Sequence, residues 1–164
     1  MLIELDVSFR LARADDLAAL EWMGLFTRQS AIIADAFTAQ ERGDGAMLLA
    51  LTGGFPVGQA WLDFARAGSA SCPRIWAVRV FPPMQGAGLG TRLMTEAEDI
   101  AVARGAVAVE VGVEWDNDGG RRLYQRLGYR PVGAERERID YAFEGYEMVM
   151  DIDQQVLRKA LGER

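Results

Sequence analysis

Hydrophobic residues recur along the chain with two different periods, and this pattern predicts both strands and helices. The clearest alternation covers residues 106–113, where Val107, Val109, Val111 and Val113 point to one face of a strand. Short alternating or apolar runs bounded by Gly and Pro predict further strands over residues 3–9, 46–51, 57–64, 74–81, 129–138 and 146–152. Residues 52–56 are expected to form a hairpin turn between the second and third of these strands.

Helical periodicity occupies the intervals between several strands. It predicts a helix after Asp15 or Asp16, a second over residues 27–42, and a third from the segment 86–90 to about Arg104. A short helix capped by Asn117 and a C-terminal helix over residues 153–161 complete the set. The order of elements predicts an α/β fold with a single mixed, mostly antiparallel central sheet flanked by helices. A right-handed parallel β-α-β unit is expected between residues 74 and 113.

Composition narrows the class of protein. The 164 residues show no repeat or linker, so we expect one domain over residues 1–164. The net charge of −6 argues against nucleic-acid binding and suits cationic substrates such as amines. The absence of His excludes His-based triads and most catalytic zinc sites, so we expect no metal. Lys159 is the single lysine among 18 basic residues, which is typical of GC-rich bacterial sources.

The sequence also bears on location. No apolar run approaches the roughly 20 residues of a membrane helix, and residues 1–9 contain Glu4 and Asp6 without a basic region. We therefore expect neither a membrane span nor a signal peptide. A single cysteine, Cys72, permits no disulfide within the chain, which favours a reducing, cytoplasmic location.

The segment from Val80 to Thr91 combines features of a phosphate site. Pro82 and Pro83 end a strand, and three glycines within five residues let the backbone approach a ligand closely. A helix begins directly afterwards, and the free N–H groups and dipole of its first turn attract anions. The segment therefore predicts a phosphate or pyrophosphate site, to which the Thr91 hydroxyl adds a donor.

Three protein families use such a loop, and the residues of this segment show which of the three it resembles. A Walker A loop requires a Lys after the last glycine, where this chain has Thr91. A dinucleotide fingerprint requires a third glycine at that same position. The spacing Val80-x-Pro82-x-x-Gln85-Gly86-x-Gly88-x-Gly90 instead resembles motif A of the GCN5-related N-acetyltransferase (GNAT) family.

A second motif extends the resemblance. The family's Asn-x-x-Ala-x-x-Leu-Tyr and following Gly-Phe/Tyr match the segment from Asn117 to Leu123-Tyr124 and then Gly128-Tyr129. One position departs, because Gly120 stands where the family has Ala, and this weakens helix propensity by roughly 1 kcal/mol. The resemblance is specific over residues 74–133, the cofactor-binding core, and approximate elsewhere.

The resemblance implies acetyl-CoA as cofactor and assigns roles to particular residues. Tyr124 matches the family's general acid, and a strand N–H near Val78 would stabilise the oxyanion. Glu110 and Glu114 point off the face opposite the valines and are candidate general bases, with a slight preference for Glu114. The residues expected to contact the cofactor are Val78, Val80, Gln85, Gly86, Ala87, Gly88, Leu89, Gly90, Thr91, Asn117 and Tyr124.

The expected activity is transfer of an acetyl group from acetyl-CoA to a primary amine by direct attack in a ternary complex. Two alternatives remain open: a non-catalytic acyl-CoA sensor, and a transferase that uses a longer acyl-CoA. The acceptor, a small-molecule or peptide amine, would be selected by residues 15–42 and 139–146. Homodimers formed through the last strands are common among proteins of this kind, and the sequence leaves the oligomeric state open.

Overall fold

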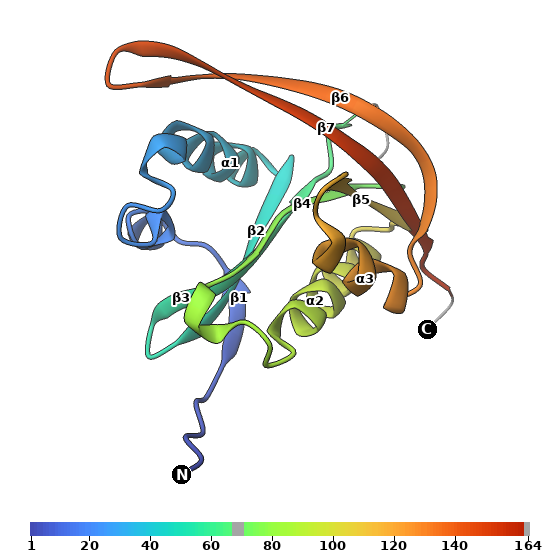
Figure 1. Cartoon of the computed structure of the whole chain (residues 1–164), viewed down its shortest axis with the longest axis horizontal. Coiled ribbons are helices and arrows are strands. Elements are labelled where there is room, and N and C mark those ends of the chain that lie inside the picture. The colour runs from blue at the N-terminus through green and yellow to red at the C-terminus, as the bar shows by residue number, and fades with distance from the viewer. Residues whose placement is uncertain (67–70, 163–164) are drawn as a thin grey trace.

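The computed structural model describes residues 1–66 and 71–162, and a seven-stranded sheet dominates it (Figure 1). The strands lie in the order β1-β2-β3-β4-β5-β7-β6, and only β4 and β5 pair in parallel. The sheet is therefore mixed and mostly antiparallel, as predicted. The strands are β1 (Ser8–Leu11), β2 (Gly45–Thr52), β3 (Phe55–Asp63), β4 (Arg74–Val80), β5 (Ala108–Glu114), β6 (Arg130–Phe143) and β7 (Tyr146–Ala160).

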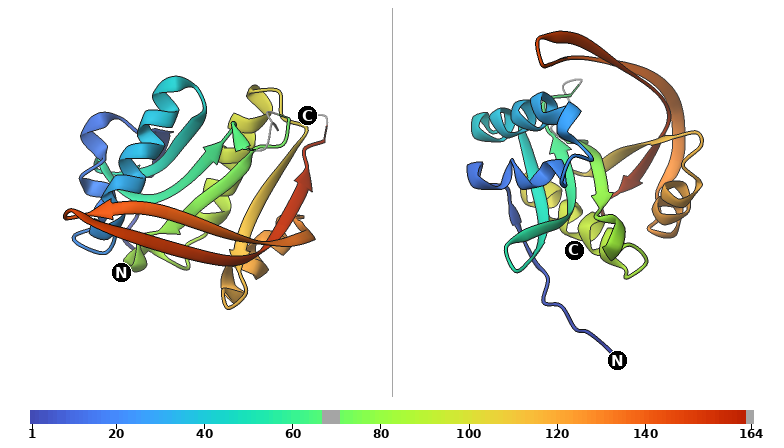
Figure 2. Two further views of the ribbon diagram at one scale, coloured as in Figure 1. Left: turned by 90° about the horizontal axis from the view of Figure 1, so that it is seen from above. Right: turned by 60° about the vertical axis from the view of Figure 1, so that its left-hand side comes forward.

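Helices cover both faces of the sheet. On one face, α2 (Leu89–Ala103) and α3 (Asp118–Arg126) bury their apolar stripes in the larger core, which includes Leu93 and Tyr124. A Cβ at Gly58 of β3 would lie 2.8 Å from Leu93 Cδ1, so this glycine lets α2 lie close to the sheet. On the other face, α1 (Ser30–Arg42) packs against Trp61 and forms a second core. The β6–β7 hairpin curves away from the body and over α1 (Figures 1 and 2).

The predicted C-terminal helix over residues 153–161 is wrong, because this segment is the second half of β7. Seven consecutive residues of β5 pair with β7, from Ala108 opposite Ala160 to Glu114 opposite Gln154. β5 pairs with β4 over only two residues, so β7 is the strand that satisfies most of its backbone groups. Val156 and Leu157 are buried by this pairing. Tertiary pairing thus overrides a sequence that also reads as a helix.

The N-terminal predictions need smaller corrections. The first strand covers Ser8–Leu11 rather than residues 3–9, and Ile3 and Leu5 are exposed. The helix expected after Asp15 or Asp16 is a pair of 3-10 turns, Ala14–Asp16 and Ala19–Glu21. Asp16 bonds to the Arg13 amide and forms an ion pair with Arg10, so its side chain closes the turn instead of capping a helix. The segment 27–42 begins with a third such turn, Thr27–Gln29, before α1.

A buried ion pair joins α2 to β7. The Glu98 carboxylate, with 3% of its side chain exposed, lies 2.5 Å from Nζ of Lys159 and accepts a hydrogen bond from the Tyr129 hydroxyl at 3.4 Å. Removing one partner from such a pair leaves a buried charge without compensation, which costs far more than losing a surface pair.

Lys159→Met is therefore expected to lower the free energy of unfolding by about 3 kcal/mol, measured by urea denaturation. Glu98→Leu in the same chain should restore most of that loss, because the unpaired carboxylate is then absent. Arg92→Ala breaks the exposed Arg92–Glu96 pair on the same helix and should cost less than about 0.5 kcal/mol. A loss below about 1 kcal/mol for Lys159→Met would show that water solvates Glu98.

Candidate active site

A slot between β4 and β5 forms the centre of the site. The two parallel strands pair only at Arg74 with Glu110 and at Ile75 with Val111. Beyond Ile75, β4 pairs only with β3, so the two strands separate toward their carboxyl ends. This end of a parallel strand pair is where ligands bind in open α/β sheets.

A bulge at Ala77 increases this separation. Ala77 has φ +51°, in the left-handed region that few non-glycine residues occupy. The β3–β4 register shifts at the same place, and Trp76 and Ala77, although consecutive, both pack against the α1-side core. Within the described strands, the register gives neither Ala77 nor Val78 a partner on β3 or β5. The regular ladder is therefore interrupted at these two residues, which is where the backbone of a bulged strand is able to turn toward a ligand in the slot.

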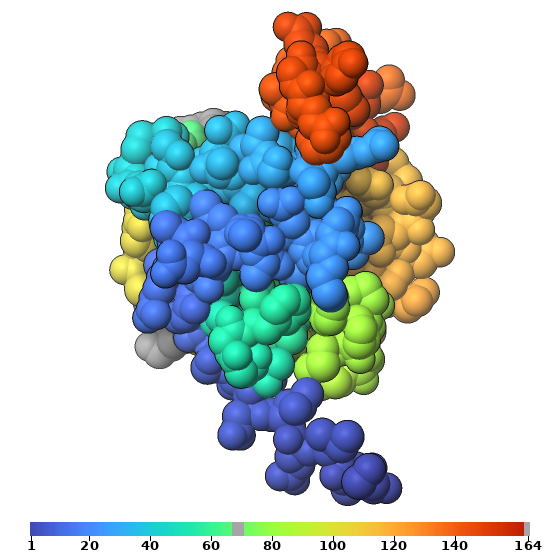
Figure 3. All heavy atoms as spheres, turned by 90° about the vertical axis from the view of Figure 1, so that its left-hand side faces the viewer, coloured from blue at the N-terminus to red at the C-terminus, as the bar shows by residue number. Residues whose placement is uncertain are grey.

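The slot continues into a large cavity of about 840 Å³. Its walls come from α1, from Trp76 to Arg79 of β4, from Val111 to Glu114 of β5, and from the β6–β7 hairpin. The helix α1 contacts β6, and in the space-filling view the hairpin tip projects above the N-terminal segments (Figure 3). The predicted acceptor-side segments 15–42 and 139–146 both contribute, through residues such as Asp35 and Asp140. A cavity of this size is in the range of small-molecule sites.

The predicted phosphate loop precedes α2 and is exposed. Gly86 and Gly88 both have φ +82°, and a Cβ on either would meet no protein atom within 4 Å. Gly88 is the residue directly before the first turn of α2, so the free N–H groups of that turn lie at the loop. The Gln85 side chain donates to the Val80 carbonyl oxygen at 3.1 Å, which ties the loop to the end of β4.

Gly90 brings the loop close to α3. A Cβ there would lie 3.2 Å from Leu123 Cδ2 and 3.9 Å from Val80 Cγ2. Thr91 follows in the first turn of α2, and its carbonyl oxygen accepts a bond from the Thr95 hydroxyl. Ala87 and Leu89 complete the loop, Leu89 being buried in the larger core. At the third glycine, packing between the two helices leaves little room for a side chain, and at the first two the backbone conformation favours glycine.

Asn117 caps α3, as predicted, by accepting a hydrogen bond from the Gly120 amide at 3.0 Å. It also lines the cavity. A Cβ at residue 120 would lie 2.7 Å from Asn117 Nδ2, so the glycine at this position admits the capping rotamer. The departure of Gly120 from the family pattern thus has a local reason.

Tyr124 lies on α3 where the cavity meets the larger core. Its side chain is 95% buried (relative exposure 5%), and its ring packs edge-on against Tyr129 with centroids 6.0 Å apart. Burial raises the pKa of Tyr124 to about 12, so the phenol keeps its proton over the whole physiological range. A protonated hydroxyl on the cavity wall is able to donate to a group that gains negative charge during a reaction.

The two predicted carboxylates occupy different surroundings. Glu114 ends β5 and lines the cavity. Glu110 is absent from the cavity wall and forms ion pairs with Arg158 and, at 3.2 Å, with Arg74. Burial opposes ionisation of Glu110, but hydrogen bonds from the two arginines outweigh it and lower its pKa. Because Arg74 also pairs with Glu135 of β6 at 2.7 Å, these ion pairs tie four strands together at the closed end of the slot.

Sequence reasoning overlooked Arg79. This residue lies between Val78 and Val80 in an otherwise apolar stretch of β4, and its side chain lines the cavity. The signal was present, since a single charge between two valines of a predicted central strand is unusual.

Among the described residues, no group of His, Cys, Asp and Glu side chains is arranged to hold a metal ion. In the same part of the chain, no helix has the length and apolarity to cross a membrane.

A slot that lies beside a glycine-rich helix start and opens into a cavity is the kind of site that suits an elongated ligand carrying phosphate. The family model described as the acetyltransferase (GNAT) family matches residues 11–129. The chain belongs to the GNAT family of acetyltransferases.

Individual relatives agree with this membership. The chain is 35% identical over 95 residues to a mycothiol acetyltransferase of Beutenbergia cavernae, covering 58% of this chain and 28% of that protein. It is 34% identical over 89 residues to the N-alpha-acetyltransferase RimI of Mycobacterium tuberculosis, covering 54% of this chain and 49% of RimI. The chain thus spans less than half the length of either relative. The structure of yncA from Salmonella typhimurium, solved with its cofactor acetyl-CoA, superposes with a TM-score of 0.73 at 21% identity, covering 97% and 96% of the two chains.

Proposed function

We propose that this protein transfers the acetyl group of acetyl-CoA to a primary amine, by direct attack of the amine on the thioester. The observation that carries the proposal is the slot, in which β4 and β5 separate after two paired residues beside the glycine-rich loop. Both acetyltransferases that match the chain in sequence, and the acetyl-CoA bound in the yncA structure, support this assignment. A cytoplasmic location and a small-molecule or peptide acceptor are part of the proposal.

The residues fit acetyl-CoA as a substrate. The loop from Gln85 to Gly90, with Thr91, would hold the pyrophosphate through backbone N–H groups. Backbone groups of Val78 and Val80 would bond the pantetheine arm, and the bulge at Ala77 supports this because it removes Val78 from the sheet register. Asn117 would contact the arm from the opposite side of the slot, where it lines the cavity.

The reaction forms one C–N bond and breaks the C–S bond of the thioester. The attacking amine must be neutral, and the Glu114 carboxylate, directly or through water, would accept its proton. The Val78 N–H would donate to the carbonyl oxygen as it gains negative charge. The Tyr124 hydroxyl would donate its proton to the departing sulfur, so that free thiol is released.

The activity is tested by measuring free thiol released from acetyl-CoA in the presence of a panel of amines. Release that depends on the amine supports the transferase. Binding of acetyl-CoA without release under any amine would indicate the alternative, a sensor module. Comparison of acetyl-CoA with propionyl-CoA and succinyl-CoA distinguishes an acetyltransferase from an enzyme for longer acyl groups.

Glu114→Gln is expected to lower kcat by roughly 10²-fold and to move the pH profile of the rate toward higher pH, because the base is lost. Glu110→Gln serves as the matched control, since the same change is made four residues away on β5. It should leave the pH profile in place, and a shifted profile for this variant would transfer the role of base to Glu110.

Glu110→Gln should instead change acid stability. Because the folded-state pKa of Glu110 lies below the unfolded value of about 4.3, its ion pairs stabilise the fold fully above that pH. This contribution is lost as the pH falls through the folded-state pKa. The variant should therefore be less stable than the parent at pH 7 and lose less stability between pH 6 and pH 3, measured by thermal melting.

A further inference from the structure

Arg79 is a cation without a carboxylate partner in the cavity wall. Its guanidinium carbon lies 4.2 Å from the ring centroid of Phe26, and the side chain is half-buried. Within the part of the chain that the structure describes, it forms no ion pair. The other arginines of the cavity wall are paired: Arg42 with Asp44, Arg66 with Glu135 and Glu137, and Arg74 with Glu110 and Glu135.

A second donor without an acceptor lies beside Arg79. Gln59 of β3 is the register partner of Arg79 and is fully buried. Its Oε1 accepts a hydrogen bond from Trp61 Nε1 at 2.9 Å, which fixes the direction of the amide. Its Nε2 then has no partner among the described residues. Cross-strand partners lie on the same face of a sheet, so the two donors are neighbours.

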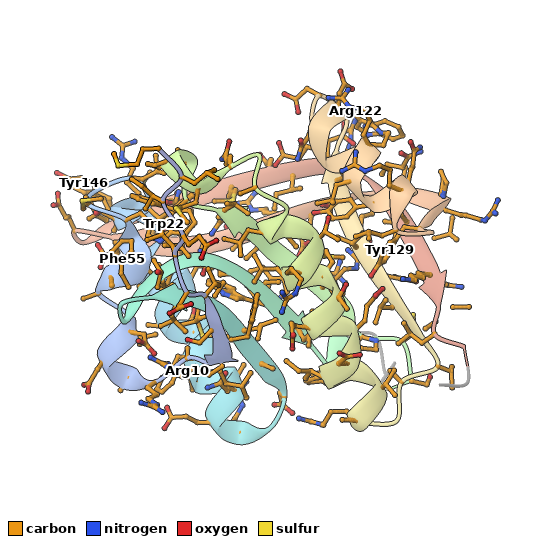
Figure 4. All side chains as sticks on the ribbon, turned by 90° about the horizontal axis from the view of Figure 1, so that it is seen from below. Arg10, Trp22, Phe55, Arg122, Tyr129 and Tyr146 are labelled. Carbon is orange, nitrogen blue, oxygen red and sulfur yellow. The ribbon has the colours of Figure 1, made fainter. Side chains whose placement is uncertain are left out.

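These donors are in an environment of low polarity. Phe26 packs against Trp22 with ring centroids 5.5 Å apart, and Trp22 packs against Phe81 at 5.4 Å. Phe81 also packs on Phe55, and Figure 4 shows Trp22 and Phe55 at the same end of the molecule. Burial lowers the pKa of Arg79, which reflects the loss of water around the guanidinium. Donors that lack acceptors in such surroundings are destabilising. Arg79 lines the cavity and Gln59 does not, so Arg79 is the donor to which a ligand in the cavity can supply an acceptor.

The chemistry of the donors and of the cavity selects the ligand group. A planar guanidinium binds a carboxylate with two parallel hydrogen bonds. The rest of the cavity wall carries Asp35, Glu114 and Asp116, for which no ion pair is found in the described residues. These carboxylates disfavour a multiply charged anion and favour an ammonium group. The complementary ligand therefore carries one carboxylate and one amine.

We propose that the acceptor is a free amino acid, whose carboxylate binds Arg79 while its α-amine faces the slot. The inference rests on the proposed acetyl transfer and adds the substrate class to it. Arg79 directly follows Val78, whose N–H is proposed to bind the reacting carbonyl of acetyl-CoA, so the two proposed contacts come from adjacent residues of β4. A short separation between amine and carboxylate, as in an α-amino acid, matches this adjacency.

The first test compares L-amino acids with their amides as acceptors in the thiol-release assay. The parent protein should favour the amino acid over its amide by about 10²-fold in kcat/KM, because the amide leaves Arg79 unpaired. Arg79→Met should abolish this preference, Arg79→Lys should retain part of it, and the KM for acetyl-CoA should not change. Equal use of amino acids and amides by the parent protein would overturn the proposal, as would an equal loss for both in Arg79→Met.

Arg104→Met provides the matched control. Arg104 also stacks on a phenylalanine, with its guanidinium carbon 4.1 Å from the Phe64 centroid, but it is absent from the cavity wall. The Arg104→Met variant should keep the full preference for amino acids over their amides. A preference lost equally in this variant would attribute the effect to a general loss of stability and overturn the role of Arg79.

A second test does not require turnover. N-acetyl amino acids, the expected products, should bind the CoA-loaded protein in calorimetric titrations at least about 10-fold more tightly than their amides, and only when Arg79 is present. If amines without a carboxylate are acetylated equally well, the inference fails and the proposed function stands. If no acceptor releases thiol but the products bind with dependence on Arg79, the proposed function fails and the carboxylate site stands. Absence of both binding and preference overturns the inference.

Discussion

Tyr124→Phe is expected to lower kcat roughly 10–10⁴-fold while the affinity for acetyl-CoA stays almost unchanged. The substitution removes one hydroxyl from the cavity wall and keeps the ring that packs against Tyr129. Since the pKa of Tyr124 is about 12, the phenol is protonated throughout the assay range and serves as a donor at every pH tested. Initial rates of thiol release, with calorimetric titration of CoA, separate the two effects.

Tyr129→Phe is the matched control for this prediction. Tyr129 is also a buried tyrosine, but its hydroxyl donates to Glu98 at 3.4 Å and not to the cavity. Its loss should lower the melting temperature and leave kcat within about 3-fold of the parent. If Tyr124→Phe turns over at the parent rate, Tyr124 is a packing residue and the proton for the sulfur comes from water.

Gly88→Val is expected to weaken CoA binding at least about 100-fold while the protein still folds. Gly88 has φ +82°, which a β-branched residue adopts only with strain, and relief of that strain would turn the first N–H groups of α2 away from the pyrophosphate. The loop is exposed and a Cβ meets no neighbour within 4 Å, so the core is not disturbed. Calorimetric titration with CoA and thermal melting measure the two consequences separately.

Gly54→Val is the matched control, because it introduces the same backbone strain at a turn that is not part of the proposed CoA site. Gly54 has φ +79° in the β2–β3 turn, and a Cβ there also meets no atom within 4 Å. It should lower stability to a similar extent and bind CoA as the parent does. Unchanged CoA affinity in Gly88→Val would move the pyrophosphate site away from this loop.

Local sequence determines the elements that proved predictable. The glycine-rich loop, the helix after it and the valine strand at residues 106–113 follow from spacing within a few turns, and α2 and β5 form where expected. The same holds for the cap at Asn117. Each of these features depends on neighbours in the chain, which a sequence shows directly.

The remaining features depend on distant partners. Residues 153–161 read as a helix because the pattern cannot show that β5 needs a partner on its far edge. The ion pairs of Glu110, a candidate general base, could not be predicted because its partners Arg74 and Arg158 lie 36 and 48 residues away in the chain. The left-handed conformation of Ala77 has no sequence signal, since glycine would be expected there. That Arg79 has no carboxylate partner in the described part of the chain depends on residues distant in the sequence, so the sequence could not show it.

The ion pair between Lys159 and Glu98 has a further consequence for a protein proposed to concentrate a reactive thioester. Acetyl-CoA modifies exposed lysine amines without any enzyme, and an acetyltransferase holds it close to its own surface. This sequence contains one lysine, whose Nζ lies 2.5 Å from the buried carboxylate of Glu98. An amine held in this ion pair is not free to attack a thioester, so we expect the pair to protect the one side-chain amine of the protein from acetylation.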